Sequence, residues 1–136
     1  MYTVLVEGDD LSDPVADAAR SYLDGHFVLE RSLAEKGHYP AIDILKSVSR
    51  LFNQLATGEV KQSVKEVRKA LSLYARMEDM VDMGAYEAGS NPALDKVLKV
   101  YPAIEKFLVQ ADDELADFEE SRIGLLNIAR ELEGAT

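Results

Sequence analysis

Apolar residues recur every three or four positions along the second half of the chain, which is the period of an α-helix with one buried face. The longest stripe lies between residues 59 and 83 and comprises Val60, Val64, Val67, Leu71, Tyr74 and Val81. Basic side chains occupy the other face of the same stretch: Lys61, Lys65, Arg68 and Lys69. The pattern predicts an amphipathic helix of about 25 residues.

Further helices are predicted after a connection rich in glycine and turn-forming residues at 84–92. Asn91 suits a helix N-cap and Pro92 the first helical position, so a helix is expected over residues 92–101. Pro102 is expected to start a separate turn, and a last helix follows with Gly134 just beyond it. Three or four helices would form a small bundle. Its core is expected to include Val64, Leu71, Tyr74, Phe107, Phe118 and Leu125.

The first third of the chain has a different pattern, in which short apolar runs alternate with a helix. Residues 2–6 predict a strand, and Ser12 or Asp13 is expected to cap a helix that starts at Pro14 and ends in a left-handed Gly25. A second strand over residues 26–29, a brief helix over 32–36 and an irregular stretch over 38–43 follow. No strand pattern appears after Arg50. The sequence therefore predicts an α/β part over residues 1–50 and an all-helical part over 51–136.

Composition and charge exclude several classes of protein. The 136 residues are 47% hydrophobic and carry a formal charge of −10, which disfavours nucleic-acid binding. The chain has no cysteine, no apolar run long enough to cross a bilayer and no signal-peptide pattern. These features predict a soluble, cytosolic protein.

Complete catalytic motifs are missing from the sequence. There is no G-x-x-x-x-G-K-[ST] phosphate-binding loop, and His26 and His38 are too far apart to suggest a metal site, so none is expected. They are interpreted as a strand-edge and a loop histidine. An acidic group near the amino terminus is better explained by a solvated turn and helix cap than by magnesium binding; its members are Glu7, Asp9, Asp10 and Asp13.

Several short segments, in one order along the chain, resemble the flagellar and type III protein-export ATPases, which are relatives of the catalytic subunits of rotary ATP synthases. The Gly-Ser-Asn-Pro connection at 89–92, followed by Ala-Leu-Asp95, is more similar to the flagellar members than to the virulence members. The other matching segments are residues 2–20, 23–29, 37–43, 47–50, 74–79, 83–86 and 118–121.

This resemblance implies a mostly α fold, in which residues 1–50 are the end of a RecA-like nucleotide-binding domain and residues 51–136 a carboxy-terminal helical bundle. The chain would be the carboxy-terminal part of a longer protein whose homohexamer hydrolyses ATP with Mg²⁺ to drive or prime protein export. Without the phosphate-binding loop, the chain alone is expected to be inactive and to bind no cofactor tightly.

The resemblance also implies a place in the cell and a set of partners. The expected location is the cytoplasmic face of a bacterial export apparatus, reached by peripheral association. Expected partners are the export stalk and regulator proteins and chaperone–substrate complexes, which would meet the carboxy-terminal domain. Residues 111–136 carry eight acidic and two basic side chains, a net charge of −6, which would attract a basic partner helix or be simply a solvated face.

Two residues match functional positions of the family. Arg50, which ends Ser-Val-Ser-Arg, matches the arginine finger that reaches into the neighbouring subunit's ATP site, where a guanidinium stabilises the transferred phosphoryl group. The alternative is a surface arginine that caps a helix or pairs with an acid. Tyr39 matches the tyrosine that stacks on adenine, and its alternative is a half-buried loop tyrosine. Lys46 departs from the small apolar residue of many relatives and would alter the orientation of Arg50.

Two alternatives to a flagellar export ATPase remain at this point. One is a stand-alone, non-enzymatic helical interaction module related to these ATPases. The other is part of a virulence-type secretion ATPase, which differs in biological system but not in chemistry. An upstream coding sequence with a phosphate-binding loop would separate the enzyme from the interaction module, and neighbouring genes would identify the system.

Overall fold

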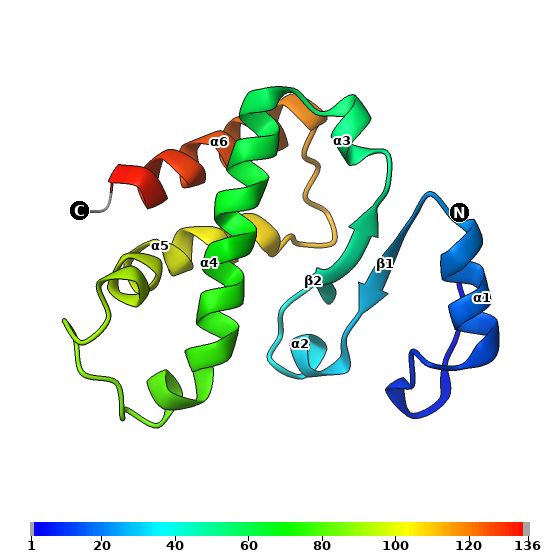
Figure 1. Cartoon of the computed structure of the whole chain (residues 1–136), viewed down its shortest axis with the longest axis horizontal. Coiled ribbons are helices and arrows are strands. Elements are labelled where there is room, and N and C mark those ends of the chain that lie inside the picture. Colours follow the sequence, from blue (N-terminus) through cyan, green and yellow to red (C-terminus); the bar gives the residue numbers. More distant parts are fainter. Residues whose placement is uncertain (1, 135–136) are drawn as a thin grey trace. The chain divides into compact units, whose positions relative to one another are not determined.

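A computed structural model describes residues 2–134, which divide into two compact units on either side of the bond between Leu55 and Ala56. The fold class expected from the sequence, mostly helical with a small sheet, is confirmed. The first unit contains α1 (Pro14–Tyr22), β1 (Gly25–Leu29), α2 (Arg31–Glu35), β2 (Ile42–Ser49) and α3 (Phe52–Leu55). The second contains α4 (Gly58–Asp82), α5 (Pro92–Leu108) and α6 (Phe118–Gly134) (Figure 1).

The sheet of the first unit is an antiparallel pair, β1 with β2, in which Gly25 lies opposite Ser49 and Leu29 opposite Ile42. The prediction of β1 is confirmed. Strand β2 was not predicted, and its first two residues, Ile42 and Asp43, fall in the stretch 38–43 that was expected to be irregular. The strand predicted at residues 2–6 is wrong, since this segment is irregular and is followed by a short 3-10 turn at Glu7–Asp9. An alternating pattern forms a strand only where a neighbour pairs with its backbone. Among the described residues, β1 and β2 pair only with each other.

Gly25 has a different role from the left-handed helix end that the sequence suggested. Helix α1 ends at Tyr22, and Gly25 is the first residue of β1, without a positive φ. A Cβ atom at this position would lie 2.7 Å from the carbonyl oxygen of Val48. Gly25 is therefore required for the close approach of the two strands rather than for a turn. Gly37, just after α2, has φ 75°, the left-handed conformation in which glycine commonly ends a helix.

Capping side chains mark the starts of α4 and α5, and the start of α5 was predicted from them. The Thr57 hydroxyl accepts the amide N–H of Val60 at the start of α4. The Asn91 side chain accepts those of Ala93 and Leu94 at the start of α5, with Pro92 in the first turn as expected. Each of the three helices contacts the other two, and Figure 1 shows α4 crossing both α5 and α6.

Helix α5 passes through Pro102 without a break, which corrects the expectation of a separate turn. A proline inside a helix removes one backbone hydrogen bond and costs about 3 kcal/mol. Burial on both sides of it offsets this cost, because Val97 and Val100 before the proline and Ile104 after it face the same core. One continuous helix presents all three side chains to α4 and α6.

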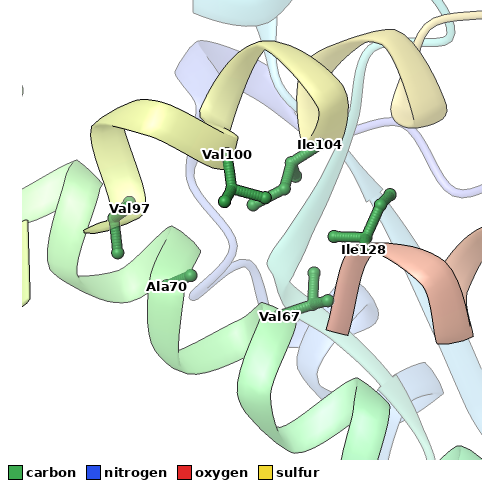
Figure 2. Packing of buried hydrophobic residues seen from close by; sticks show 6 residues of the cluster. All are labelled: Val67, Ala70, Val97, Val100, Ile104 and Ile128. Atoms are coloured by element: carbon green, nitrogen blue, oxygen red, sulfur yellow. The ribbon is translucent and has the colours of Figure 1, made fainter. Parts of the chain in front are cut away.

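The core of the second unit is a cluster to which all three helices contribute. Figure 2 shows its side chains pointing toward one another; they are Val67 and Ala70 of α4, Val97, Val100 and Ile104 of α5, and Ile128 of α6. Leu71, Tyr74 and Leu125 pack against this cluster, as expected for core residues. Val64 is half-buried. The expectation was wrong for Phe118, which is 77% exposed, and Phe107 lies at the edge of the core, where its ring approaches Gly124.

Two stacked tyrosines give the second unit a pH-dependent stability at high pH. The rings of Tyr74 and Tyr101 lie 3.7 Å apart between centroids, and burial, together with Tyr74 and nearby carboxylates, raises the pKa of Tyr101 from 10.0 to about 12. The folded state thus holds this proton more tightly than the unfolded chain. We expect the stabilisation to be complete below pH 10 and to be lost as the pH rises toward 12.

This expectation is tested by urea unfolding between about pH 9 and pH 12, the range in which tyrosines titrate. The unfolding midpoint of the unmodified chain should fall more steeply with pH than that of Tyr101→Phe, which has no proton to lose. Parallel curves for the two proteins would contradict a tightly held Tyr101 proton.

Candidate functional site

Arg50 directly follows β2 and is fixed against the carboxyl end of α1. Its Nη2 donates to the carbonyl oxygen of Arg20 at 3.0 Å and its Nη1 to that of Ser21 at 3.3 Å. Its backbone N–H donates to the carbonyl oxygen of Asp24 at 2.7 Å. The last carbonyls of a helix lack partners within the helix and carry partial negative charge, so a guanidinium is well placed there. Arg50 therefore caps α1, one of the two interpretations of this residue.

A shallow, open hollow of about 370 Å³ lies beside Arg50 in the first unit. It is lined by Asp17, Arg20, Ser21, Gly25, His26, Val48 and Arg50. His26 pairs with Val48 across the strands, and because alternate residues of a strand share a face, His26, Val48 and Arg50 lie on the same face. The sequence did not associate His26 or Arg20 with Arg50, because the pairing of β1 with the unpredicted β2 brings them together.

Arg20 contributes a second guanidinium to this hollow. Its Nη2 donates to the carbonyl oxygen of Leu11 at 2.7 Å and to Asp17 Oδ1 at 3.0 Å. Its buried Nε has no hydrogen-bond partner among the described residues. Asp17 is the one acidic residue among those that line the hollow, beside two arginines.

Tyr39 lies three residues before the first residue of β2, whereas Arg50 directly follows the last one. The exposed fraction of Tyr39 is 54%. The paired positions Leu29–Ile42 and Gly25–Ser49 are four steps apart on β1, which corresponds to about 13 Å. The structure thus places Tyr39 and Arg50 at opposite ends of the two-stranded sheet. An arrangement of this kind suits two residues that act in two different sites.

Lys46 is held by carboxylates. Its ammonium pairs with Glu30 and lies 3.6 Å from Asp43 Oδ2, and the hydrogen bond to Glu30 raises the pKa of Lys46. Asp43 Oδ1 also accepts the backbone N–H groups of Leu45 and Lys46 and so shapes an irregular segment within β2. Lys46 therefore fixes β2 to the junction of β1 and α2, whereas Arg50 is fixed to α1.

The amino-terminal acidic residues have local structural roles. The Asp13 carboxylate accepts the N–H groups of Val15 and Ala16 at the start of α1. Asp10 accepts the N–H of Ser12, and Asp9 lies 3.8 Å from Arg31. Within residues 2–134, no group of three or more His, Asp or Glu side chains is placed to hold a metal ion.

Two family models match the chain one after the other. Residues 1–49 match the nucleotide-binding domain of the ATP synthase alpha/beta family, and residues 56–127 match the T3SS EscN ATPase C-terminal domain. The second match alone covers more than half of the chain.

Similar proteins occur in both flagellar and type 3 secretion systems. The flagellum-specific ATP synthase of Salmonella typhimurium is 52% identical over 88% of this chain, and the SPI-2 type 3 secretion system ATPase of the same organism is 48% identical over 84%. In each case the chain spans 26% of the relative's length.

Solved structures of related proteins have the same fold. The assembled ATPase EscN of the enteropathogenic E. coli type III secretion system superposes with a TM-score of 0.89 and 38% identity, over 94% of this chain and 31% of EscN. EscN in complex with its central stalk EscO gives a TM-score of 0.78 and 35% identity, over 85% of this chain and 29% of that one. The chain belongs to the family of flagellar and type III secretion ATPases, relatives of the ATP synthase α and β subunits, and corresponds to their carboxy-terminal region.

Proposed function

We propose that this chain supplies the carboxy-terminal region of a flagellum-specific protein-export ATPase, whose homohexamer binds ATP with Mg²⁺ and hydrolyses it to drive or prime export. The observation that carries the proposal is the succession of two family matches, a nucleotide-binding domain followed by an export-ATPase carboxy-terminal domain. The higher identity to the flagellar than to the SPI-2 enzyme within one organism supports the flagellar assignment.

In this proposal residues 1–50 belong to the RecA-like nucleotide-binding domain and residues 51–136 form the carboxy-terminal helical domain. The division of the structure between Leu55 and Ala56 supports this assignment, as does the position of the interval between the two family matches.

Arg50 is the proposed arginine finger, which acts on ATP bound to the neighbouring subunit, and Tyr39 stacks on adenine bound to its own subunit. Their positions at opposite ends of the β1–β2 pair support roles in two different sites. Arg50 already has its guanidinium fixed by α1, and a fixed donor loses less entropy when it meets a phosphoryl oxygen. Tyr39 has an exposed ring beside a proline, as a stacking residue requires.

The partners we propose are the export stalk and regulator proteins and chaperone–substrate complexes, which bind the helical domain at the cytoplasmic face of the export apparatus. The related EscN has been solved with its central stalk EscO, which supports a stalk partner. No helix among residues 2–134 combines the length and apolar composition needed to cross a bilayer.

The chain by itself is expected to release no phosphate from ATP and Mg²⁺ above the buffer blank. Its 136 residues contain no glycine-rich loop that ends in lysine and a hydroxyl residue, so nothing holds the β- and γ-phosphates. A phosphate-release assay with the purified chain tests this. ATP turnover that persists through repeated purification would contradict it.

Tyr39→Ala in the full-length protein is expected to weaken ATP and ADP binding by roughly 2- to 13-fold, because stacking contributes about 0.5–1.5 kcal/mol. Tyr39→Phe keeps the ring and should bind normally. Tyr22→Ala is the matched control, since Tyr22 is also an exposed tyrosine of the first unit. Titration with a fluorescent adenine nucleotide measures the affinities. Equal affinities for Tyr39→Ala and Tyr22→Ala would exclude the stacking role.

A further inference from the structure

Arg20 joins the end of α1 to the segment that precedes this helix. Its Nη2 donates to the carbonyl oxygen of Leu11, nine residues earlier, at 2.7 Å and to Asp17 Oδ1 at 3.0 Å. The Arg20 side chain is 34% exposed and that of Asp17 is 73% exposed. Because the contact with Leu11 reaches backbone outside the helix, it restrains the last turn of α1 more than an exposed ion pair alone would.

The backbone of the same turn holds Arg50. The N–H of Leu23 donates to the carbonyl oxygen of Ala19 at 3.2 Å, and the next two carbonyl oxygens accept the guanidinium of Arg50. The carbonyl oxygen of Arg20 accepts Nη2 at 3.0 Å, and that of Ser21 accepts Nη1 at 3.3 Å. Arg20 thus anchors the turn with its side chain and fixes Arg50 with its backbone.

We propose that Arg20 is a positioning residue for Arg50. Its side chain holds the last turn of α1 at Leu11, and this turn holds the guanidinium of Arg50 in the orientation that serves the neighbouring subunit's ATP. Arg20 itself contacts no nucleotide in this proposal. The inference rests on the proposed role of Arg50 as an arginine finger. Position matters for such a group, because a misplacement of about 1 Å can lower a rate about 100-fold.

Positioning and local charge predict different results for the residues around Arg50. Arg20 and Asp17 both line the hollow beside Arg50, and they carry opposite charges. If charge alone decided how Arg50 acts, removal of Arg20 and removal of Asp17 would change turnover in opposite directions. Positioning predicts losses in the same direction, because either substitution loosens the same turn of α1.

Arg20→Ala in the full-length protein is expected to lower kcat about 10- to 100-fold and to leave the KM for ATP within about twofold. The loss falls on kcat because the nucleotide is held mainly by the other subunit. Asp17→Ala should lower kcat by about 1.5- to 5-fold, since it removes only the exposed ion pair and leaves the contact with Leu11 in place. Steady-state kinetics over a range of ATP concentrations measures both constants.

Arg122 supplies a matched control for this substitution. It pairs with Glu119, three residues earlier on α6, at 2.9 Å, and its side chain is 33% exposed. It belongs to the second unit and does not line the hollow beside Arg50. Arg122→Ala removes an ion pair of the same spacing and exposure, and its kcat should be normal.

Two further measurements separate positioning from a general loss of structure. When Arg50 is already alanine, Arg20→Ala should lower kcat no further, because the side chain that it positions is absent. In the 136-residue chain without nucleotide, ¹⁵N relaxation of Arg50 Nε should give a lower order parameter in Arg20→Ala than in Arg122→Ala. Asp17→Ala, which replaces an exposed side chain, keeps the test decisive if Arg20→Ala does not fold.

Three results would overturn the inference while Arg50 still acts as proposed. The first is normal kcat in both Arg20→Ala and Asp17→Ala when Arg50→Ala is inactive. The second is opposite changes in kcat for Arg20→Ala and Asp17→Ala, which would assign the effect to charge. The third is multiplied losses in the double variant, which would show that Arg20 acts independently of Arg50. Normal turnover by Arg50→Ala would instead overturn the proposed function, and the order parameter would still report whether Arg20 holds Arg50.

Discussion

ATP hydrolysis by the full-length protein is expected to fall about 10³- to 10⁵-fold when Arg50 is replaced by alanine, with nucleotide affinity almost unchanged. The reason is that a finger meets the γ-phosphoryl group most strongly in the transition state, while most of the binding energy for the nucleotide comes from the subunit that holds it. Steady-state turnover and equilibrium nucleotide binding, measured on the same preparation, separate the two effects. Normal turnover by Arg50→Ala would remove this residue from the reaction.

Controls must account for the contacts between Arg50 and α1. Alanine also removes the hydrogen bonds to the Arg20 and Ser21 carbonyls, so a small loss of thermal stability is expected alongside the kinetic loss. Arg50→Lys retains a charge beside the helix end but not the planar fork of donors, and turnover should stay low. Arg31→Ala is the matched control, because Arg31 is an exposed arginine of the same unit that does not line the hollow. Its turnover should be normal.

Mixed hexamers distinguish a finger from a purely structural arginine. Subunits with Arg50→Ala should be inactive alone, as should subunits whose upstream phosphate-binding lysine is replaced. Mixing the two should restore part of the activity, since some interfaces then combine an intact nucleotide site with an intact arginine from the neighbour. A structural role within one subunit predicts no such recovery.

The largest expected effect on stability comes from substitution of Ile104. This residue lies in the helical core and has no exposed surface. Ile104→Ala should lower the free energy of unfolding of the second unit by about 2–5 kcal/mol, from lost burial and the cavity left behind. This is a large part of the roughly 5–15 kcal/mol that stabilises an ordinary domain. Urea unfolding followed by circular dichroism measures the change.

Ile123→Ala is the control for this substitution, because Ile123 is on α6 and 50% exposed. The same atoms are removed, but little cavity forms, and alanine has the higher helix propensity. The expected change is below about 1 kcal/mol. Similar losses for both variants would show that Ile104 is not packed as the structure describes.

The helical unit could be predicted closely because its signals are local. The spacing of apolar residues placed α4 within a residue or two of its observed bounds. The capping residues Asn91 and Pro92 placed the start of α5. Pro102 was misjudged, since its local tendency to end a helix is overcome by core contacts on both sides. Phe118 was misjudged for the opposite reason, because its spacing fits a core stripe although the start of α6 leaves it exposed.

The first unit was predicted less well because strands depend on distant partners. Residues 2–6 have the alternating pattern of a strand but no neighbour among the described residues, whereas β2 is interrupted by Asp43 and Lys46 yet pairs with β1. The same pairing places His26 beside Arg50. These two residues are 24 positions apart in the sequence, so local patterns could not show that they are neighbours. Arg50 and Tyr39 were singled out only through a resemblance to a family's functional positions, and both the positions and the chemical roles stay predictions.

The position of Arg50 has a thermodynamic consequence for α1. A guanidinium has five N–H groups, four of them on Nη1 and Nη2. In Arg50, one N–H of Nη1 and one of Nη2 donate to carbonyl oxygens at the end of this helix. A phosphoryl group that takes the same N–H groups must compete with the two carbonyls, so its affinity is reduced by the free energy of those contacts. Linkage is reciprocal, and an anion bound at Arg50 would therefore loosen the last turn of α1 by the same free energy. Amide exchange in that turn would then report whether an anion is bound at Arg50.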